Sequence, residues 1–377
     1  MPAGYDPALV ERVREAFARL NDKQAVADEL GLSRSKVRRV LQTEAEGRLG
    51  QGSHEMLPGF SVSKVSTLHN RDGEVVAQWV QQRPEKEEQE AALQAVIAGM
   101  AAELPRAAPI DAPILVNPLL CTQYTFTDFH LGALCWRKEG GADWDVSIAE
   151  QTGAGAMQAM VDGAPSSDTA IVNIQGDWLH ADGLVPVTPS HGHVLDADSR
   201  FGRVVEVSIR LIRRLVGLAA EKHRRVILLI CEGNHDLTSS LWLRKLFGAL
   251  YENEPRVTVH DSELPYYALQ WGKVMLGYHH GHLRKNSELP LLFAAQFAPM
   301  WGATTKRYIN TGHRHHKEDK EHAGARVIQH PTLAARDAYA ARGGWISERA
   351  ITAMTFHQEY GEVGTVTICP EMLEAAA

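Results

Sequence analysis

The sequence contains few cysteines, and their spacing excludes a disulfide framework. Its 377 residues include only four, with no C-x-x-C spacing: Cys121, Cys135, Cys231 and Cys369. Scattered thiols suit a reducing compartment better than an extracellular one. We therefore expect no disulfides.

Long apolar runs and an excess of positive charge are also missing. No stretch approaches the roughly 20 apolar residues of a membrane span, and Met1 to Val10 lack the basic start and apolar run of a secretory signal. A soluble cytoplasmic protein without a membrane partner is therefore expected. The net charge of -7 gives no overall attraction to nucleic acid, so any DNA contact requires a local basic surface.

The composition is that of a globular protein, with 44% hydrophobic and 23% charged residues. The chain is longer than the roughly 100 to 200 residues of one domain, which favours one large domain with an appendage. Histidine is abundant, and many of the 18 histidines lie in short clusters in the C-terminal two-thirds.

Residues 7–44 have apolar positions at the spacing of three short helices. We expect Gly31 at a turn and Ser33 at the N-cap of the helix that follows. That helix carries four basic residues without a nearby acid: Arg34, Lys36, Arg38 and Arg39. The segment resembles a helix-turn-helix unit, so we assign residues 1–48 as a small all-α DNA-binding domain that contacts DNA through those four residues. A helical bundle with a solvated basic face, or one that binds a protein partner, has the same pattern.

Residues 49–106 differ in composition and are interpreted as a linker. Two alternating runs around Asp72 and Gly73 predict a β-hairpin, and residues 84–104 have a helical composition with an acidic first turn. From residue 107 to 377, apolar runs alternate with longer amphipathic segments, which predicts an α/β domain. Strands are predicted at 114–116, 124–127, 171–174 and 226–230, and helices at 146–161 and 204–220. Short β-rich runs nearer the C-terminus predict a mixed or second sheet.

Polar residues follow the predicted strands and fill two later histidine-rich segments. They are Asp128, His130, Asp177, Asn234, His235, Asp236, His280, His313 and His315. Because the carboxyl ends of strands converge on one edge of an open α/β sheet, we expect these residues to form a single site.

These residue types suit a pair of divalent cations. A carboxylate can bridge two cations, for which Asp177 is the natural candidate, while neutral imidazoles and an amide oxygen complete each coordination shell. Two metals about 3.5 to 4 Å apart can clamp a phosphate, acidify a bridging water and stabilise the charge of an in-line displacement. Hydrolysis of a phosphate ester is therefore predicted.

The order D-x-H, G-D, G-N-H-D, H-G-H and G-H-x-H, over roughly residues 115–316, resembles the calcineurin-like metallophosphoesterase superfamily. The resemblance implies a two-sheet α/β sandwich flanked by helices. It implies one metal on Asp128, His130, Asp177 and His315, and a second on Asp177, Asn234, His280 and His313. His235 would be a non-ligand that protonates the leaving group or stabilises charge, with Asp236 helping to orient it. We expect manganese first, although the same ligands accept iron, zinc or nickel.

Neighbouring residues leave alternatives open. His279 could replace His280 as a ligand, although Gly281 after His280 favours His280, and His282 and His316 are expected beside the ligands or in solvent. Arg284 and Lys285 could contact phosphate oxygens, with solvated surface cations as the simpler interpretation. Residues 178–203 form either a substrate-facing loop or an ordinary surface excursion.

The leading functional hypothesis is a phosphodiesterase that acts as a nuclease, because a DNA-binding unit on the same chain would raise the local concentration of a DNA substrate. The aspartate of G-N-H-D, where Ser/Thr protein phosphatases commonly have glutamate, favours this branch. The alternatives are a phosphoprotein or nucleotide phosphatase of the same superfamily and a non-catalytic DNA-binding regulator. The oligomeric state stays open.

Overall fold

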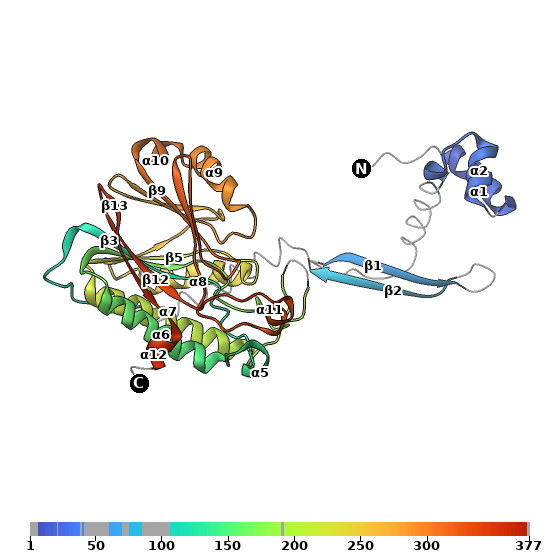
Figure 1. The fold of residues 1–377 in the computed structure, drawn as a ribbon. Coiled ribbons are helices and arrows are strands. Elements are labelled where there is room, and N and C mark those ends of the chain that lie inside the picture. Colours follow the sequence, from blue (N-terminus) through green and yellow to red (C-terminus); the bar gives the residue numbers. More distant parts are fainter. Residues whose placement is uncertain are drawn as a thin grey trace. The chain divides into compact units, whose positions relative to one another are not determined.

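The computed structural model describes residues 7–20, 22–37, 40, 60–69, 75–84, 106–189 and 192–374. The chain divides into two compact units, Met1–Leu93 and Gln94–Ala377, which we describe separately (Figure 1).

The first unit begins with helices α1 (Pro7–Leu20) and α2 (Lys23–Leu30). The Asp22 carboxylate caps α2 by accepting hydrogen bonds from the N–H groups of residues 24 and 25, both at 2.8 Å. Gly31 ends α2 at a φ of 63°, which glycine adopts without steric cost. The Ser33 hydroxyl accepts from the Lys36 N–H at 3.2 Å, and residues 34–37 and 40 are helical. The buried core of these helices comprises Val13, Ala16, Val26, Ala27, Val37 and Val40.

The basic helix differs from expectation at Arg34. Backbone hydrogen bonds lower the pKa of Asp22, and the charge of Arg34 lowers it further. The expectation that no acid lies near the basic residues therefore does not hold for Arg34, which interacts electrostatically with Asp22 without forming an ion pair in the described residues. Arg34 is exposed and Lys36 is half-buried. Arg38 and Arg39 lie outside the described residues.

A β-hairpin follows in the same unit. Strands β1 (Phe60–His69) and β2 (Val75–Pro84) pair antiparallel, which confirms the hairpin expected around Asp72 and Gly73. The turn residues themselves lie outside the described ranges, as does the helix predicted over 84–104 apart from its first residue, which ends β2.

The second unit contains two sheets. The larger has the strand order β13-β12-β3-β4-β5-β6, with β3 to β6 parallel and β12 and β13 antiparallel at one edge. Its strands are β3 (Asn117–Phe126), β4 (Ser167–Ile174), β5 (Arg225–Ile230), β6 (Val257–His260), β12 (Ile351–His357) and β13 (Gly361–Ile368).

The smaller sheet has the order β10-β11-β9-β8-β7, in which β8, β9 and β11 are parallel neighbours. Its strands are β7 (Tyr267–Trp271), β8 (Val274–Tyr278), β9 (Lys306–Thr311), β10 (Glu318–His322) and β11 (Ala325–Gln329). Apolar residues from both sheets form one buried cluster that includes Ile171, Leu229, Leu276 and Phe356. The two sheets therefore pack face to face.

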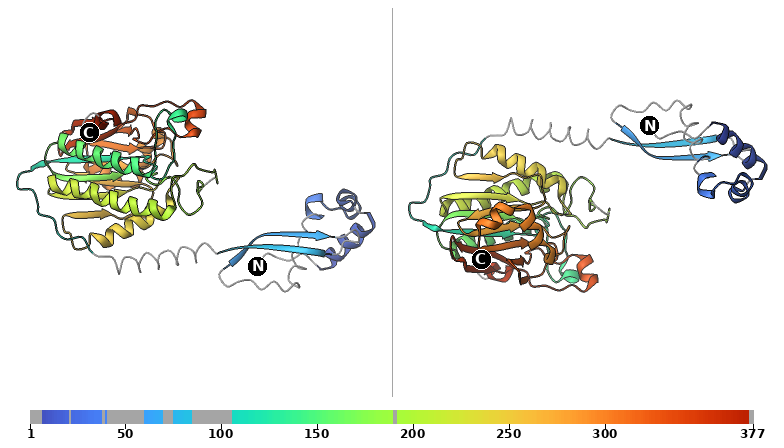
Figure 2. Two further views of the ribbon diagram at one scale, coloured as in Figure 1. Left: turned by 90° about the horizontal axis from the view of Figure 1, so that it is seen from below. Right: turned by 90° about the horizontal axis from the view of Figure 1, so that it is seen from above.

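Helices cover the outer face of each sheet. Helices α6 (Val146–Gly163), α7 (Phe201–Lys222) and α8 (Leu237–Leu250) pack on the larger sheet, and Figure 2 shows α6 and α7 side by side along it. Helices α9 (Leu289–Gln296) and α10 (Ala298–Ala303) contribute to a cluster with the smaller sheet. Short helices complete the unit: α5 (Arg137–Gly140), η1 (Asn286–Glu288), α11 (Ala338–Gly343) and α12 (Pro370–Glu374). The expected two-sheet α/β sandwich flanked by helices is confirmed.

One predicted strand is wrong. Residues 114–116 are irregular, and β3 begins only at Asn117. Ile114 and Leu115 are 92% and 84% exposed, because this apolar triplet has no sheet to pack against. No helix in the described ranges is long and apolar enough to cross a membrane.

Candidate metal centre

Each candidate residue of the metal site lies just after the carboxyl end of a parallel strand. The larger sheet contributes three such loops, after β3, β4 and β5, and the smaller sheet contributes two, after β8 and β9. The loops carry, in that order, Asp128 and His130, Asp177, Asn234 and His235, His280, and His313 and His315. Converging strand ends therefore gather residues that are far apart in sequence.

The backbone of these loops is unusually constrained. Among described residues other than glycine, six have a left-handed φ, and five of these are candidate ligands: Asp128 (49°), His130 (47°), Asp177 (50°), His313 (71°) and His315 (56°). Such conformations cost free energy in residues with a Cβ and concentrate at functional sites. The sharp turns at these residues direct their side chains toward one another.

One group of potential ligands comprises Asp128, His130 and His315, whose ligand atoms lie within 4.8 Å of one another. Asp128 Oδ1 lies 3.3 Å from His315 Nε2, which in turn lies 3.2 Å from His130 Nε2. The Asp128 carboxylate also accepts hydrogen bonds from the His313 N–H at 2.8 and 3.0 Å. The loops after β3 and β9 are therefore joined at this carboxylate.

A second group comprises Asp177, His280 and His313, again within 4.8 Å. His280 Nε2 lies 3.1 Å from Asp177 Oδ2 and 3.7 Å from Asp128 Oδ1, so His280 connects the two groups. The opposite nitrogen, Nδ1, lies 3.0 Å from the Gln175 carbonyl oxygen, to which it can donate. This contact leaves Nε2 directed at the carboxylates, as a metal ligand requires.

The electrostatics of both groups suit bound cations. Although burial disfavours its charge, interactions led by His280 hold the pKa of Asp177 well below its usual range. Burial and neighbouring histidines lower the pKa of His130 and of His313. Burial opposes protonation of His280, but Asp177 and Asp128 raise its pKa to about 10. Ionised carboxylates beside neutral imidazoles are the protonation states that bind divalent metals, and a cation at this place would take over the role of the His280 proton.

Asn234 supplies an independent sign of a ligand. Its side-chain oxygen is buried and has no hydrogen-bond partner among the described residues. A buried unpartnered oxygen is costly unless water or an ion satisfies it. The donor set of carboxylates, imidazoles and one amide oxygen therefore fits divalent cations.

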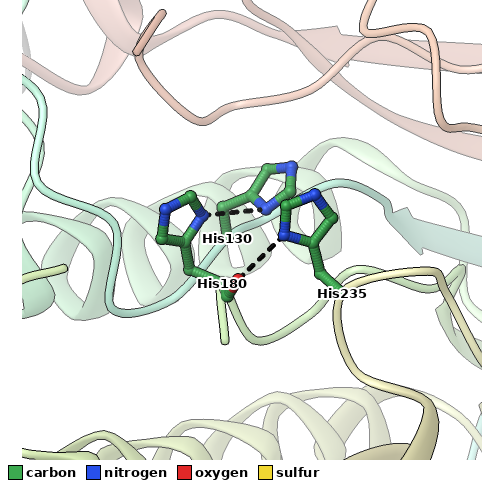
Figure 3. A group of neighbouring side chains, drawn as sticks. All are labelled: His130, His180 and His235. Carbon is green, nitrogen blue, oxygen red and sulfur yellow. Dashed lines mark hydrogen bonds between the residues drawn. The ribbon is translucent and has the colours of Figure 1, made fainter. Parts of the chain in front are cut away.

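His235 lies outside the two ligand groups and beside His130 and His180 (Figure 3). Its Nδ1 lies 2.8 Å from the His180 carbonyl oxygen, so Nδ1 carries the donated proton and Nε2 is left for other contacts. The His235 N–H donates to Asp177 Oδ1 at 2.8 Å. His235 is thus held next to the candidate metal ligands by two backbone-mediated contacts.

Sequence reasoning missed His180. Its side chain is 3% exposed and its Nδ1 lies 3.4 Å from Nδ1 of His130. His130, His180 and His235 form a third group with ligand atoms within 4.8 Å. The available signal was its position three residues after Asp177, where the chain still follows the loop of β4.

Asp236 plays a different part from the one implied by the resemblance. Its buried carboxylate accepts from the N–H groups of Trp178 at 2.7 Å, Gly233 at 2.9 Å and Asp177 at 3.2 Å. These bonds tie the loop after β4 to the loop after β5. The contact that orients the His235 ring comes from the His180 carbonyl instead.

Three further histidines lie close in sequence to the candidate ligands. His280, and not His279, enters a ligand group. The His279 ring instead contacts Tyr266, and its Nδ1 lies 3.0 Å from the Pro265 carbonyl oxygen. The His282 ring lies 5.5 Å from that of His280, whereas His316 is exposed.

The 178–203 segment is anchored at its start. The Asp182 carboxylate accepts from the N–H groups of Thr238 at 2.8 Å and Ser239 at 2.7 Å, in the first turn of α8. The beginning of this segment is thus tied to α8, while Leu184 and Val194 are 88% and 85% exposed.

The chain was compared with known proteins. No family model matches the chain, and no curated protein matches it. A similar solved structure is a conserved protein of Streptococcus pneumoniae described as a predicted phosphoesterase, with 11% identity over 67% of this chain and 91% of that chain and a TM-score of 0.30. Another is an archaeal phosphodiesterase, with 14% identity, 66% and 99% coverage and a TM-score of 0.34. A third is Vps29 of Entamoeba histolytica complexed with zinc, with 12% identity, 66% and 98% coverage and a TM-score of 0.29.

Proposed function

We propose that this protein is a metal-dependent phosphodiesterase that cleaves DNA and holds two divalent cations, with manganese as the first candidate. One observation carries the proposal: His280 connects two carboxylate–imidazole groups at the converging ends of parallel strands. Two cations bound there would clamp a phosphate diester and acidify a water for in-line attack on phosphorus.

The roles of the chain's own residues follow from their positions. Asp128, His130 and His315 would hold one cation, His280, His313 and Asn234 the other, and Asp177 both. His235 belongs to neither of the two carboxylate-containing groups, and its Nδ1 contacts the His180 carbonyl, so its Nε2 would be available to meet the leaving group or a phosphate oxygen. Asp236 contributes by fixing the two loops on which Asp177 and Asn234 stand.

The first unit would supply the DNA contact. We propose residues 1–48 as a helix-turn-helix domain that contacts DNA through Arg34, Lys36, Arg38 and Arg39, residues 49–106 as a linker and residues 107–377 as the catalytic domain. The capped α2, the left-handed Gly31 and the Ser33 cap before a basic helix support this assignment. DNA held by this domain would be concentrated at the site.

The test is a hydrolysis assay on the full chain with Mn²⁺ and with a chelator. The substrates are an aryl phosphodiester, an aryl phosphomonoester, and single- and double-stranded DNA. We expect Mn²⁺-dependent cleavage of the diester and of DNA, and slower cleavage of the monoester. Preference for the monoester would instead identify a phosphatase. If none of the substrates is cleaved in a metal-dependent manner, the proposal that the protein is an enzyme is refuted.

Two variants separate binding from chemistry. Asp177→Ala is expected to lose both metals and all activity, whereas His235→Ala should retain both metals and lose about 10²- to 10⁴-fold in turnover, the range for a missing general acid. Metal content measured by mass spectrometry alongside turnover checks both expectations. Loss of metal from His235→Ala would contradict the assignment of His235 as a non-ligand.

A further inference from the structure

A cavity of about 220 Å³ lies beside the metal-bearing loops of the smaller sheet. Arg314, which stands between His313 and His315, lines it, and so does Lys285, five residues after His280. The third wall is β10, the edge strand of the sheet. The cavity is therefore built from the same two loops that present three of the candidate ligands.

The alternation of β10 explains the charge of this cavity. Successive side chains of a strand point to opposite faces, so Glu318, Lys320 and His322 share one face and all three line the cavity. Val327 of β11, the register partner of Lys320, also lines it. The acidic residues Asp319 and Glu321 belong to the other face of β10, where Asp319 pairs with Arg326. The pleat thus places Lys320 on the cavity face and two of the three acids of β10 on the opposite face.

Positive charge in the cavity is not neutralised by the protein. Arg314, Lys285 and Lys320 have no ion pair within the described ranges, and the one carboxylate in the lining, Glu318, faces the Asn286 amide at 3.4 Å. Three cations against one carboxylate leave an excess of positive charge. An anion would supply partners for these three cations.

We propose that this cavity holds a second phosphate group of the substrate while the scissile phosphate lies at the metal centre. The inference rests on the proposed function and specifies its substrate class: a phosphodiester that carries another phosphate close to the scissile one. The cavity is smaller than the roughly 300 to 1,000 Å³ of pockets for drug-sized ligands, so it suits a phosphate group and not a whole nucleotide. Arg314 is the chief contact, because a guanidinium binds phosphate oxygens in a bidentate manner.

The test uses three dithymidylates: TpT, with one phosphate, and its forms with a terminal 5′ or 3′ phosphate. Affinities are measured by calorimetry on the full chain with a chelator present, and kcat/KM is measured with Mn²⁺. We expect one phosphorylated form to exceed TpT by about tenfold or more in both measurements, the gain of one charge-assisted contact. Arg314→Gln should bring the ratio close to one, and Lys320→Gln should lower it.

The matched control is Lys306→Gln. Lys306 is an exposed cation at the start of β9, the end opposite to His313, and it does not line the cavity. This variant should keep the wild-type ratio. Equal values for TpT and both phosphorylated forms, or an unchanged ratio in Arg314→Gln, would overturn the second phosphate site even if TpT is hydrolysed. A ratio that depends on Arg314 in the calorimetry alone, with no hydrolysis of TpT, would support the phosphate site and reject the proposed phosphodiesterase.

Discussion

Each ring nitrogen of His130 has its own contact, and the two contacts suit different roles. Nε2 faces His315 in a ligand group, while Nδ1 faces Nδ1 of His180 at 3.4 Å. If Nε2 binds a cation, Nδ1 must carry the proton and donate it, which makes His180 the acceptor. Burial and the charge of His235 lower the pKa of His180 to about 4, so His180 is neutral and able to accept.

Removal of the His180 ring is therefore expected to weaken metal binding without displacing His235. His180→Ala deletes the acceptor of His130 but keeps the backbone carbonyl that holds His235. We expect a loss of about 10- to 100-fold in affinity for one of the two metals, the usual effect of removing an outer partner of a ligand. A Mn²⁺ titration followed by electron paramagnetic resonance measures it.

His316→Ala is the control, because His316 is exposed and belongs to none of the ligand groups. It should bind both metals as the wild type does. Wild-type affinity at both sites in His180→Ala would show that the His130 ring needs no support from His180.

At the scale of elements, the site depends on glycines where two loops approach each other. A Cβ on Gly233 would lie 2.0 Å from Asp177 Oδ1 and 2.3 Å from the Asp177 backbone nitrogen. Neither atom can move freely, because Asp177 N also donates to Asp236 and Oδ1 accepts from His235. The loops after β4 and β5 fit together only if residue 233 has no side chain.

Gly233→Ala is thus expected to displace Asp177 and to lower both metal affinity and stability. Overpacking of this kind typically reduces the free energy of unfolding by about 1 to 3 kcal/mol. Metal content and urea unfolding of the metal-free protein measure the two effects separately. Gly217→Ala is the matched control, since Gly217 lies within α7 and a Cβ added there would have nothing within 4 Å, so alanine should stabilise the helix by up to about 1 kcal/mol. If Gly233→Ala and Gly217→Ala had the same metal content and stability, the close approach of the loops after β4 and β5 would be contradicted.

The same loops explain which parts of the site could be predicted from sequence. Asp128, Asp177 and Asn234 follow hydrophobic strands, so strand periodicity and the convergence of strand ends were enough to bring them together. His180 could not be recognised this way. Its place depends on the polar 178–203 segment turning back onto the site, with Asp182 bound to the start of α8, and a turn-rich sequence does not encode that path in its periodicity.

At the scale of the whole molecule, the α/β domain was predictable because long amphipathic helices and buried strands alternate with strong periodicity, whereas the two-sheet sandwich was expected only from the resemblance of the motifs to a known superfamily. The prediction was wrong where periodicity is weak, as for the exposed triplet at 114–116, which is too short to distinguish a strand from a connector. Contacts between helices in the first unit were not predictable either. The proximity of Asp22 to Arg34 arises from the turn between α2 and the next helix, which sequence spacing alone does not define.

That proximity sharpens the expectation for DNA binding. Because Asp22 interacts with Arg34, the helix should bind DNA through few phosphate contacts, and the dependence of affinity on salt should be correspondingly modest. In the full chain, Arg34→Gln combined with Lys36→Gln should lower kcat/KM for long duplex DNA relative to that for TpT. The slope of log affinity against log salt should fall by about 2, since each phosphate contact contributes about 0.9.

Lys23→Gln provides the control for these two substitutions. Lys23 is an exposed cation at the start of α2, outside the basic helix, and its loss changes the net charge without removing a proposed contact. Its salt slope should stay close to that of the wild type. If Lys23→Gln and the double variant reduce the slope in proportion to the charge removed, attraction to DNA would depend on the total charge of the unit and not on the helix after Gly31. If neither Lys23→Gln nor the double variant changes the salt slope, the first unit binds a partner other than DNA. The metal centre would then select its substrate without help from the first unit.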